Sequence, residues 1–213
     1  MPLFLRSLPL AGLLAAGLAA PMAYAANDSG TAADGLSTAI FAGGCFWCME
    51  PPYDRQPGVT STTSGYIGGE LENPGYDDVS RGGTGHAEAV KITYDPDAID
   101  YAELLDIFWR NVDPFAEDRQ FCDSGPQYRS AIFYQDERQR ELAEASLAEM
   151  QERFDQPIAT ELSSAGAFWD AEDYHQNYYE KNPLRYKFYR FRCGRDDRLE
   201  EIWGDEAGGP TFD

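Results

Sequence analysis

Two of the chain's four cysteines follow closely behind a pair of glycines: Cys45 comes directly after them, and Cys48 lies three residues further on. The short apolar run 37–42 that precedes the glycines predicts a buried strand, and 45–50 predicts the start of a short helix. A thiol at the start of a helix lies near free backbone N–H groups and the positive end of the helix dipole, which lower its pKa. Cys45 is therefore a candidate nucleophile, and the glycines let the backbone approach a substrate closely.

The four cysteines also allow other interpretations. In an exported protein Cys45, Cys48, Cys122 and Cys193 would ordinarily form two structural disulfides, as in a non-catalytic acidic binding module. A zinc site is a weaker alternative, because the single Cys-x-x-Cys pair has no second pair at matching spacing. That pair is also typical of a thioredoxin-like disulfide oxidoreductase, which is the second enzymatic hypothesis.

Four segments of the chain together resemble the A-type peptide methionine sulfoxide reductases. They are 43–47 (GGCFW), 84–90 (TGHAEAV), 127–132 (QYRSAI) and 171–176 (AEDYHQ). They occur in the family's order across residues 38–183, and four such matches very rarely arise together by chance. The resemblance implies reduction of methionine S-sulfoxide, free or in proteins, to methionine through a sulfenic acid on Cys45 and then an intramolecular disulfide.

The reaction sets physical requirements that named residues can meet. A sulfoxide oxygen is a poor leaving group, so attack by a thiolate needs a proton donor, and the resemblance assigns this role to Glu88. Glu88 suits this role if burial keeps its carboxyl protonated. Most of the 37 acidic residues are expected to lie on the surface, and only the motif distinguishes Glu88 from them. Tyr76 and Tyr128 match the family's two tyrosines, whose hydroxyls can donate to the developing oxygen charge. Asp123 matches an acidic residue that is expected to orient the substrate or a tyrosine.

The aromatic residues after Cys45 have a candidate role in binding. Phe46 and Trp47 would form a wall for the S-methyl group of the substrate, although core packing is an equal alternative for Phe46. His86 and His175 are the only two histidines, and we interpret both as structural. The sequence predicts no metal site.

A second thiol is needed to convert the sulfenic acid of Cys45 into a disulfide. Better-known relatives carry this resolving cysteine in a Gly-rich C-terminal tail, a pattern that residues 186–204 lack. Cys193, Cys48 and Cys122 all stay open as candidates, with a preference for Cys193 because its aperiodic segment could swing over Cys45. The resemblance implies no cofactor, since electrons would come from a thioredoxin-like dithiol reductant.

The elements that must position these residues alternate along the chain. Strands are predicted at 37–42, 60–66, 89–94, 129–134 and 158–162, helices at 45–50, 101–112, 136–154 and 171–181, and loops at 71–85 and 113–127. There is no repeat and no Gly-rich phosphate loop. The pattern favours an α+β two-layer sandwich with helices packed on a mixed, mostly antiparallel sheet, which is also the ferredoxin-like fold that the resemblance implies.

The N-terminus resembles a secretory signal. Arg6 precedes an apolar run at 8–20, and Ala-Tyr-Ala at 23–25 fits a cleavage site. We expect a signal peptide at 1–25, a flexible lead-in at 26–36, the reductase domain at 37–204, a flexible tail at 205–213, and a periplasmic or secreted protein. A stable membrane anchor is not expected, because the apolar run is short and interrupted by glycines.

Composition limits the partners. The 213 residues, of which 43% are hydrophobic, are enough for one sizeable core. A net charge of -20 repels nucleic acid and anionic lipid headgroups. The expected partners are therefore peptides or proteins that contain methionine sulfoxide and the dithiol reductant, and the protein is expected to be a monomer.

Overall fold

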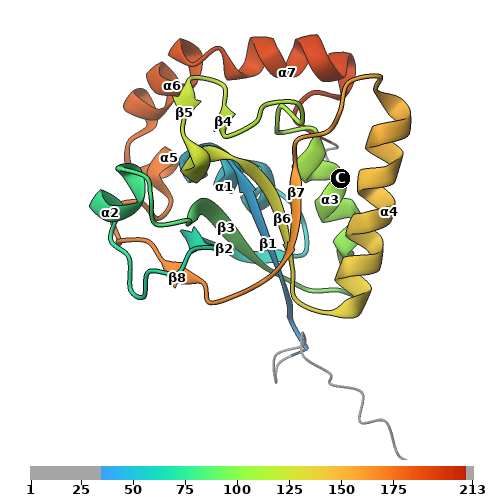
Figure 1. The fold of residues 1–213 in the computed structure, drawn as a ribbon, viewed down its shortest axis with the longest axis horizontal. Helices are drawn as coiled ribbons and strands as arrows, with labels where there is room; N and C mark the ends of the chain where they lie inside the picture. Colours follow the sequence, from blue (N-terminus) through green and yellow to red (C-terminus); the bar gives the residue numbers. More distant parts are fainter. Residues whose placement is uncertain (1–34, 210–213) are drawn as a thin grey trace, which may run out of the picture.

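The computed structural model describes residues 35–209 and is built on one six-stranded sheet (Figure 1). Its strand order is β7-β6-β1-β3-β2-β8. The strands are β1 (Ser37–Gly43), β2 (Val59–Ile67), β3 (Ala87–Tyr94), β6 (Ser130–Tyr134), β7 (Glu161–Ser164) and β8 (Trp169–Asp170). Neighbouring strands are antiparallel except β6 and β7, which are parallel.

The helices α1 (Phe46–Asp54), α3 (Tyr101–Trp109) and α4 (Glu137–Arg153) pack against one face of the sheet, and this arrangement confirms the predicted α+β class (Figure 1). The other described α-helices are α2 (Tyr76–Ser80), α5 (Tyr178–Lys181), α6 (Pro183–Arg192) and α7 (Arg195–Trp203). Of the described helices, none is long and apolar enough to cross a membrane.

Alternation along β1 divides the core into two layers. Ala39 and Phe41 belong to the large cluster that includes α3 residues such as Phe108. Ile40 and Ala42 lie in a smaller cluster on the opposite face, which Phe168 helps to cover. Both faces of β1 are therefore buried, as expected for the central strand that leads into the catalytic segment.

Two predictions about the C-terminal part were wrong. The helix predicted at 171–181 forms only in its last turn, α5, because Gln176 accepts from Ser64 N at 2.8 Å and donates to Ser64 O at 2.9 Å. These bonds tie the preceding turns to β2, and Asn177 adopts a left-handed φ of 51° that no helix interior allows. The segment expected to be aperiodic forms α6 and α7, which meet at Gly194 with a φ of 62°.

The two predicted loops contain short elements. Residues 71–85 include α2, and 113–127 include a hairpin of β4 (Arg119–Gln120) and β5 (Asp123–Ser124), followed by the 3-10 helix η1 (Pro126–Tyr128). The strand predicted at 158–162 begins three residues later, as β7.

The structure also describes part of each segment that flanks the predicted domain. At the C-terminal end, residues 204–206 form the 3-10 helix η2, and Glu206 pairs with Arg110 and Arg153 within the segment that we expected to be a flexible tail. The predicted signal peptide, most of the lead-in and residues 210–213 lie outside the described residues.

Candidate active site

Cys45 occupies the N-cap position of α1, between the end of β1 and the first helical residue. Gly44 makes this turn with a φ of +83°, and a Cβ atom added to it would lie 2.6 Å from Gln120 Cβ. Only glycine fits that backbone conformation and that space without strain. The predicted strand-turn-helix setting of the thiol is therefore confirmed.

Glu88 projects from β3 towards the start of α1. Its side chain is buried, and the backbone N–H of Phe46 donates to Glu88 Oε2 at 3.2 Å. Burial raises the pKa of this carboxyl to about 8, although the hydrogen bond from Phe46 opposes the shift. Glu88 is thus mainly protonated at neutral pH, as a proton donor at this place must be.

The thiol of Cys45 does not have the lowered pKa that its helix position led us to expect. Burial raises the pKa of Cys45 well above its usual value, and the charges of Glu88, Cys48 and Asp123 raise it further. A hydrogen bond with Tyr189 opposes these effects only in part. Desolvation and nearby acidic groups outweigh the helix start here, so the thiolate is a minor species at neutral pH.

Tyr76 and Tyr128 lie close to Glu88 and Cys45, as the motifs predicted. Tyr76 begins α2 and Tyr128 ends η1. Burial, followed by the charges of Glu88 and Cys45, raises the pKa of Tyr76 to about 12. Burial and Glu88 also raise the pKa of Tyr128, so both phenols keep their protons and can donate hydrogen bonds. Tyr76 is held in place because its backbone N–H donates to Glu172 Oε1 at 2.8 Å.

Asp123 lies on the β4–β5 hairpin and is bound by a tyrosine that the sequence analysis did not identify. The hydroxyl of Tyr189, on α6, donates to Asp123 Oδ2 and also contacts the thiol of Cys45. Burial raises the pKa of Asp123, while its bond with Tyr189 and the charge of Arg195 lower it. The pattern could have revealed Tyr189, because Asn-Pro at 182–183 is a helix-start signal and Tyr186 and Tyr189 follow at helical spacing.

An aromatic wall stands beside the thiol. Trp47 stacks on Tyr178 with ring centroids 3.7 Å apart, and its indole N–H donates to His175 Nδ1 at 3.0 Å. Phe46 lies 4.9 Å from the His175 ring and 6.0 Å from that of Tyr66. Burial lowers the pKa of His175 to about 4, so the ring is neutral and serves the wall rather than acid–base chemistry.

The ring of the other histidine, His86, is held by backbone groups. The N–H of Gly69 donates to His86 Nδ1 at 3.1 Å, and His86 Nε2 lies 2.8 Å from the carbonyl oxygen of Leu71. Both ring nitrogens therefore have partners away from the thiol. This geometry agrees with the structural role that we predicted for His86.

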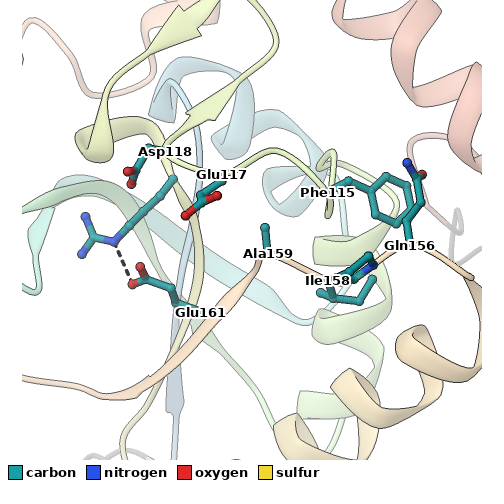
Figure 2. Close-up of a pocket in the computed structure, with 9 residues that line it drawn as sticks. Phe115, Glu117, Asp118, Gln156, Ile158, Ala159 and Glu161 are labelled. Atoms are coloured by element: carbon teal, nitrogen blue, oxygen red, sulfur yellow. Dashed lines mark hydrogen bonds and ion pairs between the residues drawn. The ribbon is translucent and has the colours of Figure 1, made fainter.

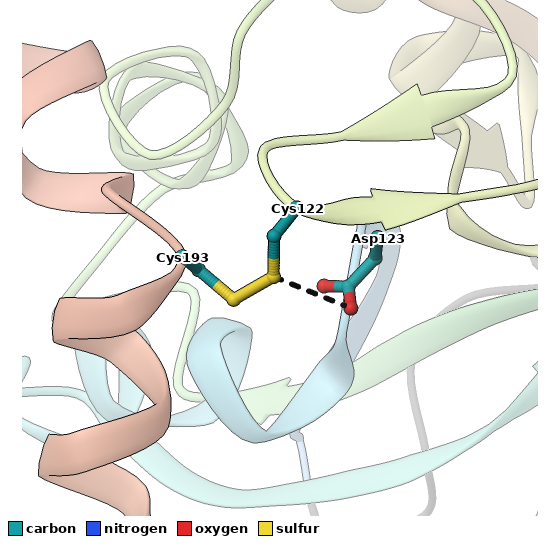
Figure 3. Close-up of side chains that lie close together, drawn as sticks. All are labelled: Cys122, Asp123 and Cys193. Atoms are coloured by element: carbon teal, nitrogen blue, oxygen red, sulfur yellow. Dashed lines mark hydrogen bonds between the residues drawn. A yellow bond between two sulfur atoms is a disulfide. The ribbon is translucent and has the colours of Figure 1, made fainter.

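The cysteines are paired in a way that the sequence analysis did not anticipate. Cys122 and Cys193 form a disulfide beside Asp123 (Figure 3), and Cys45 and Cys48 are free and buried. This pairing excludes two structural disulfides, and it takes Cys193 away from the resolving role that we had preferred for it. Cys122, Asp123 and Cys193 are close enough to form a candidate metal site, but a metal would need the two sulfur atoms as separate thiolates.

Cys48 lies one helical turn beyond Cys45 in different surroundings. It packs with Tyr178 and Tyr186 in a small apolar cluster. Burial raises the pKa of Cys48 and Asp123 adds to the rise, while the charges of Arg195 and Arg190 and a hydrogen bond with Arg190 offset it only in part. Cys48 is thus the thiol with cationic neighbours, whereas those of Cys45 are acidic.

One further pocket lies apart from these groups (Figure 2). Phe115, Ile158 and Ala159 line one part of it, and Arg129 and Glu161 form an ion pair at 2.9 Å in another part. None of its lining residues is among the candidate catalytic residues. The pocket therefore adds nothing to the chemistry at Cys45.

Comparisons with known proteins find relatives along most of the described chain. The family model described as peptide methionine sulfoxide reductase matches residues 37–207. A peptide methionine sulfoxide reductase of Bacillus licheniformis is 50% identical over 168 residues, which are 78% of this chain and 93% of the relative. One from Ligilactobacillus salivarius is 52% identical over 169 residues, which are 78% and 97% of the two chains.

Two solved structures share the fold. Reduced Mxr1 of Saccharomyces cerevisiae has a TM-score of 0.66 at 32% identity, covering 74% of this chain and 91% of its own. Methionine sulfoxide reductase A of Corynebacterium diphtheriae has a TM-score of 0.64 at 35% identity, covering 70% and 76%.

Proposed function

This chain belongs to the peptide methionine sulfoxide reductase family, and from that premise we propose how its own residues carry the reaction. The thiolate of Cys45 attacks the sulfur of a methionine S-sulfoxide while Glu88 donates its proton to the oxygen. The new S–S bond then breaks as the oxygen passes from the methionine sulfur to Cys45, so that methionine leaves, Cys45 becomes a sulfenic acid that keeps the donated proton, and Glu88 is left as a carboxylate. The observation that supports this most directly is a buried carboxyl with a pKa of about 8 at the thiol.

The neighbouring side chains serve the same step. The hydroxyls of Tyr76 and Tyr128 donate to the oxygen as negative charge develops on it. Trp47, held between Tyr178 and His175, offers a rigid apolar surface to the S-methyl group. A wall fixed by stacking and by a hydrogen bond costs little entropy when the substrate binds.

We propose Cys48 as the resolving thiol. Its thiolate attacks the sulfenic sulfur of Cys45, a disulfide forms, and the oxygen leaves as water after protonation. Cys48 is already one turn away, with its backbone N–H bonded to Cys45 O at 3.0 Å, and Arg190 and Arg195 favour its thiolate. Because the Cys122–Cys193 disulfide occupies the other two sulfur atoms, Cys48 can resolve Cys45 without rearranging it.

Two electrons must then return to the Cys45–Cys48 pair. We propose a thioredoxin-like dithiol protein as their source, since a dithiol supplies two electrons and needs no cofactor in this chain. The pattern at residues 1–25 supports export, and the substrates would then be oxidised exported proteins. Mass analysis of the mature protein from the producing cell tests this, because cytoplasmic protein that keeps residues 1–25 would contradict it.

A single-turnover experiment tests the chemistry. Purified enzyme without reductant is mixed with a peptide that contains methionine sulfoxide, and both products are analysed by mass. We expect one oxygen to be lost per enzyme and a Cys45–Cys48 link to appear in the unreduced digest. Cys45→Ser should abolish the oxygen loss. Cys48→Ser should still remove one oxygen but leave Cys45 as a sulfenic acid, and a Cys45–Cys193 link in the wild type would refute this assignment.

A further inference from the structure

The outer face of α6 carries large apolar side chains in water. Leu184 is 83% exposed, Phe188 65% and Phe191 79%, and their spacing of four and three residues places them on one stripe of the helix. Among residues 35–209 the other exposed large hydrophobic side chains are less exposed, Leu71 at 42% and Tyr174 at 56%. Three such side chains gathered on one helix face indicate a binding surface.

The charge of this helix is opposite to that of the whole protein. Residues 183–192, which form α6, contain four of the 17 Lys and Arg residues and no Asp or Glu, in a chain of net charge -20. Arg192 lies over the ring of Phe188, with its guanidinium carbon 5.9 Å from the ring centroid. Apolar and cationic groups are therefore interleaved, which suits an occupant that carries apolar and acidic side chains.

The opposite side of α6 forms part of the active site. Tyr189 contacts Cys45 and Asp123, and its ring packs edge-on against Trp47 at 5.9 Å. A polypeptide that places a methionine sulfoxide side chain at Cys45 must cross one of the elements around the site. On α2, the first turn is acidic and would repel acidic segments, whereas α6 attracts them.

Two other occupants fit the surface less well. A second copy docked symmetrically on α6 would bring two strongly cationic helices together. An anionic bilayer would also meet the exposed carboxylates at the start of α7, where Asp196 and Asp197 follow α6 closely. A single extended segment avoids both conflicts, because it can lie on α6 alone.

We propose that the outer face of α6 (Leu184, Phe188 and Phe191 with Arg185, Lys187 and Arg192) binds an extended apolar and acidic segment of the substrate polypeptide. The stripe is about 10 Å long at 1.5 Å per helical residue, the length of about three extended residues. This inference rests on the proposed function.

The test compares three variants on two substrates with dithiothreitol as the reductant. Leu184→Ser/Phe188→Ser/Phe191→Ser removes the stripe, Arg185→Glu/Lys187→Glu/Arg192→Glu reverses the charge, and Leu71→Ser is the matched control outside α6. The substrates are a synthetic peptide with Leu, Phe and Asp around one methionine sulfoxide, and N-acetylmethionine sulfoxide.

We expect both α6 variants to raise the KM for the peptide about tenfold, with kcat/KM for N-acetylmethionine sulfoxide unchanged. The charge-reversed variant should favour the same peptide with Lys in place of Asp. The Leu71 control should match the wild type on both substrates. Leu184→Ser alone repeats the test with a smaller shift if the triple variant does not fold.

Several outcomes would overturn the proposal. An unchanged KM for the peptide in both α6 variants would do so. So would a loss of activity that appears only when a dithiol protein replaces dithiothreitol, because the surface would then bind the reductant. A different result would indicate that the stripe binds membranes. The wild type would then sediment with anionic phosphatidylglycerol vesicles, the stripe variant would not, and both would keep the same peptide kinetics. A wild type that reduces neither substrate would refute the proposed function itself.

Discussion

Replacing Glu88 with Gln should slow oxygen transfer and at the same time make Cys45 more acidic. A carboxyl with its ordinary pKa of 4.5 would be about 0.3% protonated at pH 7, whereas a pKa of about 8 leaves about 90% protonated. Burial thus raises the proton-donating population about 300-fold. Because Gln has no proton to give, we expect a loss of roughly 10²-fold or more in the single-turnover rate.

The effect on the thiol has the opposite sign. The charge of Glu88 raises the pKa of Cys45, so a neutral amide in its place should lower that pKa. Thiolate absorbance near 240 nm and the rate of alkylation against pH both measure this shift. A side chain that only supported the fold would not slow the chemistry while activating the nucleophile.

The pH profiles should also differ in shape. In the wild type the rate should rise with pH as thiolate forms, and then level off near pH 8 as Glu88 loses its proton. The Glu88→Gln rate should be lower throughout but rise past pH 8 to the new thiol pKa. Unaltered single-turnover rates in Glu88→Gln, or a wild-type rate that climbs steeply through pH 9, would refute the assignment of Glu88 as the donor.

Three further predictions concern the surroundings of the site. Tyr76→Phe and Tyr128→Phe should each lower the single-turnover rate by about tenfold, less than Glu88→Gln, because each hydroxyl partly covers for the other. Burial raises the pKa of Glu50 from 4.5 to about 7, so ionisation of this carboxyl should lower the free energy of unfolding by about 3 kcal/mol as pH rises from 4.5 to 7. Urea unfolding should show a smaller decline in that free energy for Glu50→Gln. Replacing Cys122 and Cys193 with Ser should lower the free energy of unfolding by about 4 kcal/mol, since the bond closes a loop of 71 residues, while dithiothreitol-supported activity persists.

The elements that the sequence predicted correctly have strong local patterns. In β3, alternating residues such as Val90 and Ile92 point to the helix side, and in α3 Leu104 and Phe108 recur at helical spacing. The failures lie where long-range contacts override local preference. Gln176, for example, bonds to Ser64, which is 112 residues away in sequence, and no local pattern contains that partner.

At the site, motifs predicted which residues meet but could not predict their electrostatics. Glu88 was expected to be useful only if buried, and its burial depends on packing between β3 and α1. The pKa of Cys45 is raised rather than lowered, first because the thiol is buried and then because Glu88 on β3 and Asp123 on β5 lie near it, and neither cause can be read from the sequence around Cys45. Tyr189 was missed for a simpler reason: α6 buries Tyr186 and partly buries Tyr189 but exposes Phe188 and Phe191, so aromatic residues lie on both faces and only the Asn-Pro start signal pointed to a helix.

The two thiols of α1 have opposite surroundings, and this contrast matches the order of steps in the proposed cycle. Cys45 lies near Glu88 and Asp123, so a proton stays available for the sulfoxide oxygen, which cannot leave without one. Cys48 must instead act as a nucleophile towards a sulfenic sulfur, and the guanidinium groups of Arg190 and Arg195 favour the thiolate that this needs. One helix, α6, contributes to both settings, because Tyr189 faces Cys45 and Arg190, one residue later, faces Cys48. A neutral substitution at Arg190 should therefore slow disulfide closure and let the sulfenic acid accumulate, while oxygen transfer keeps its rate.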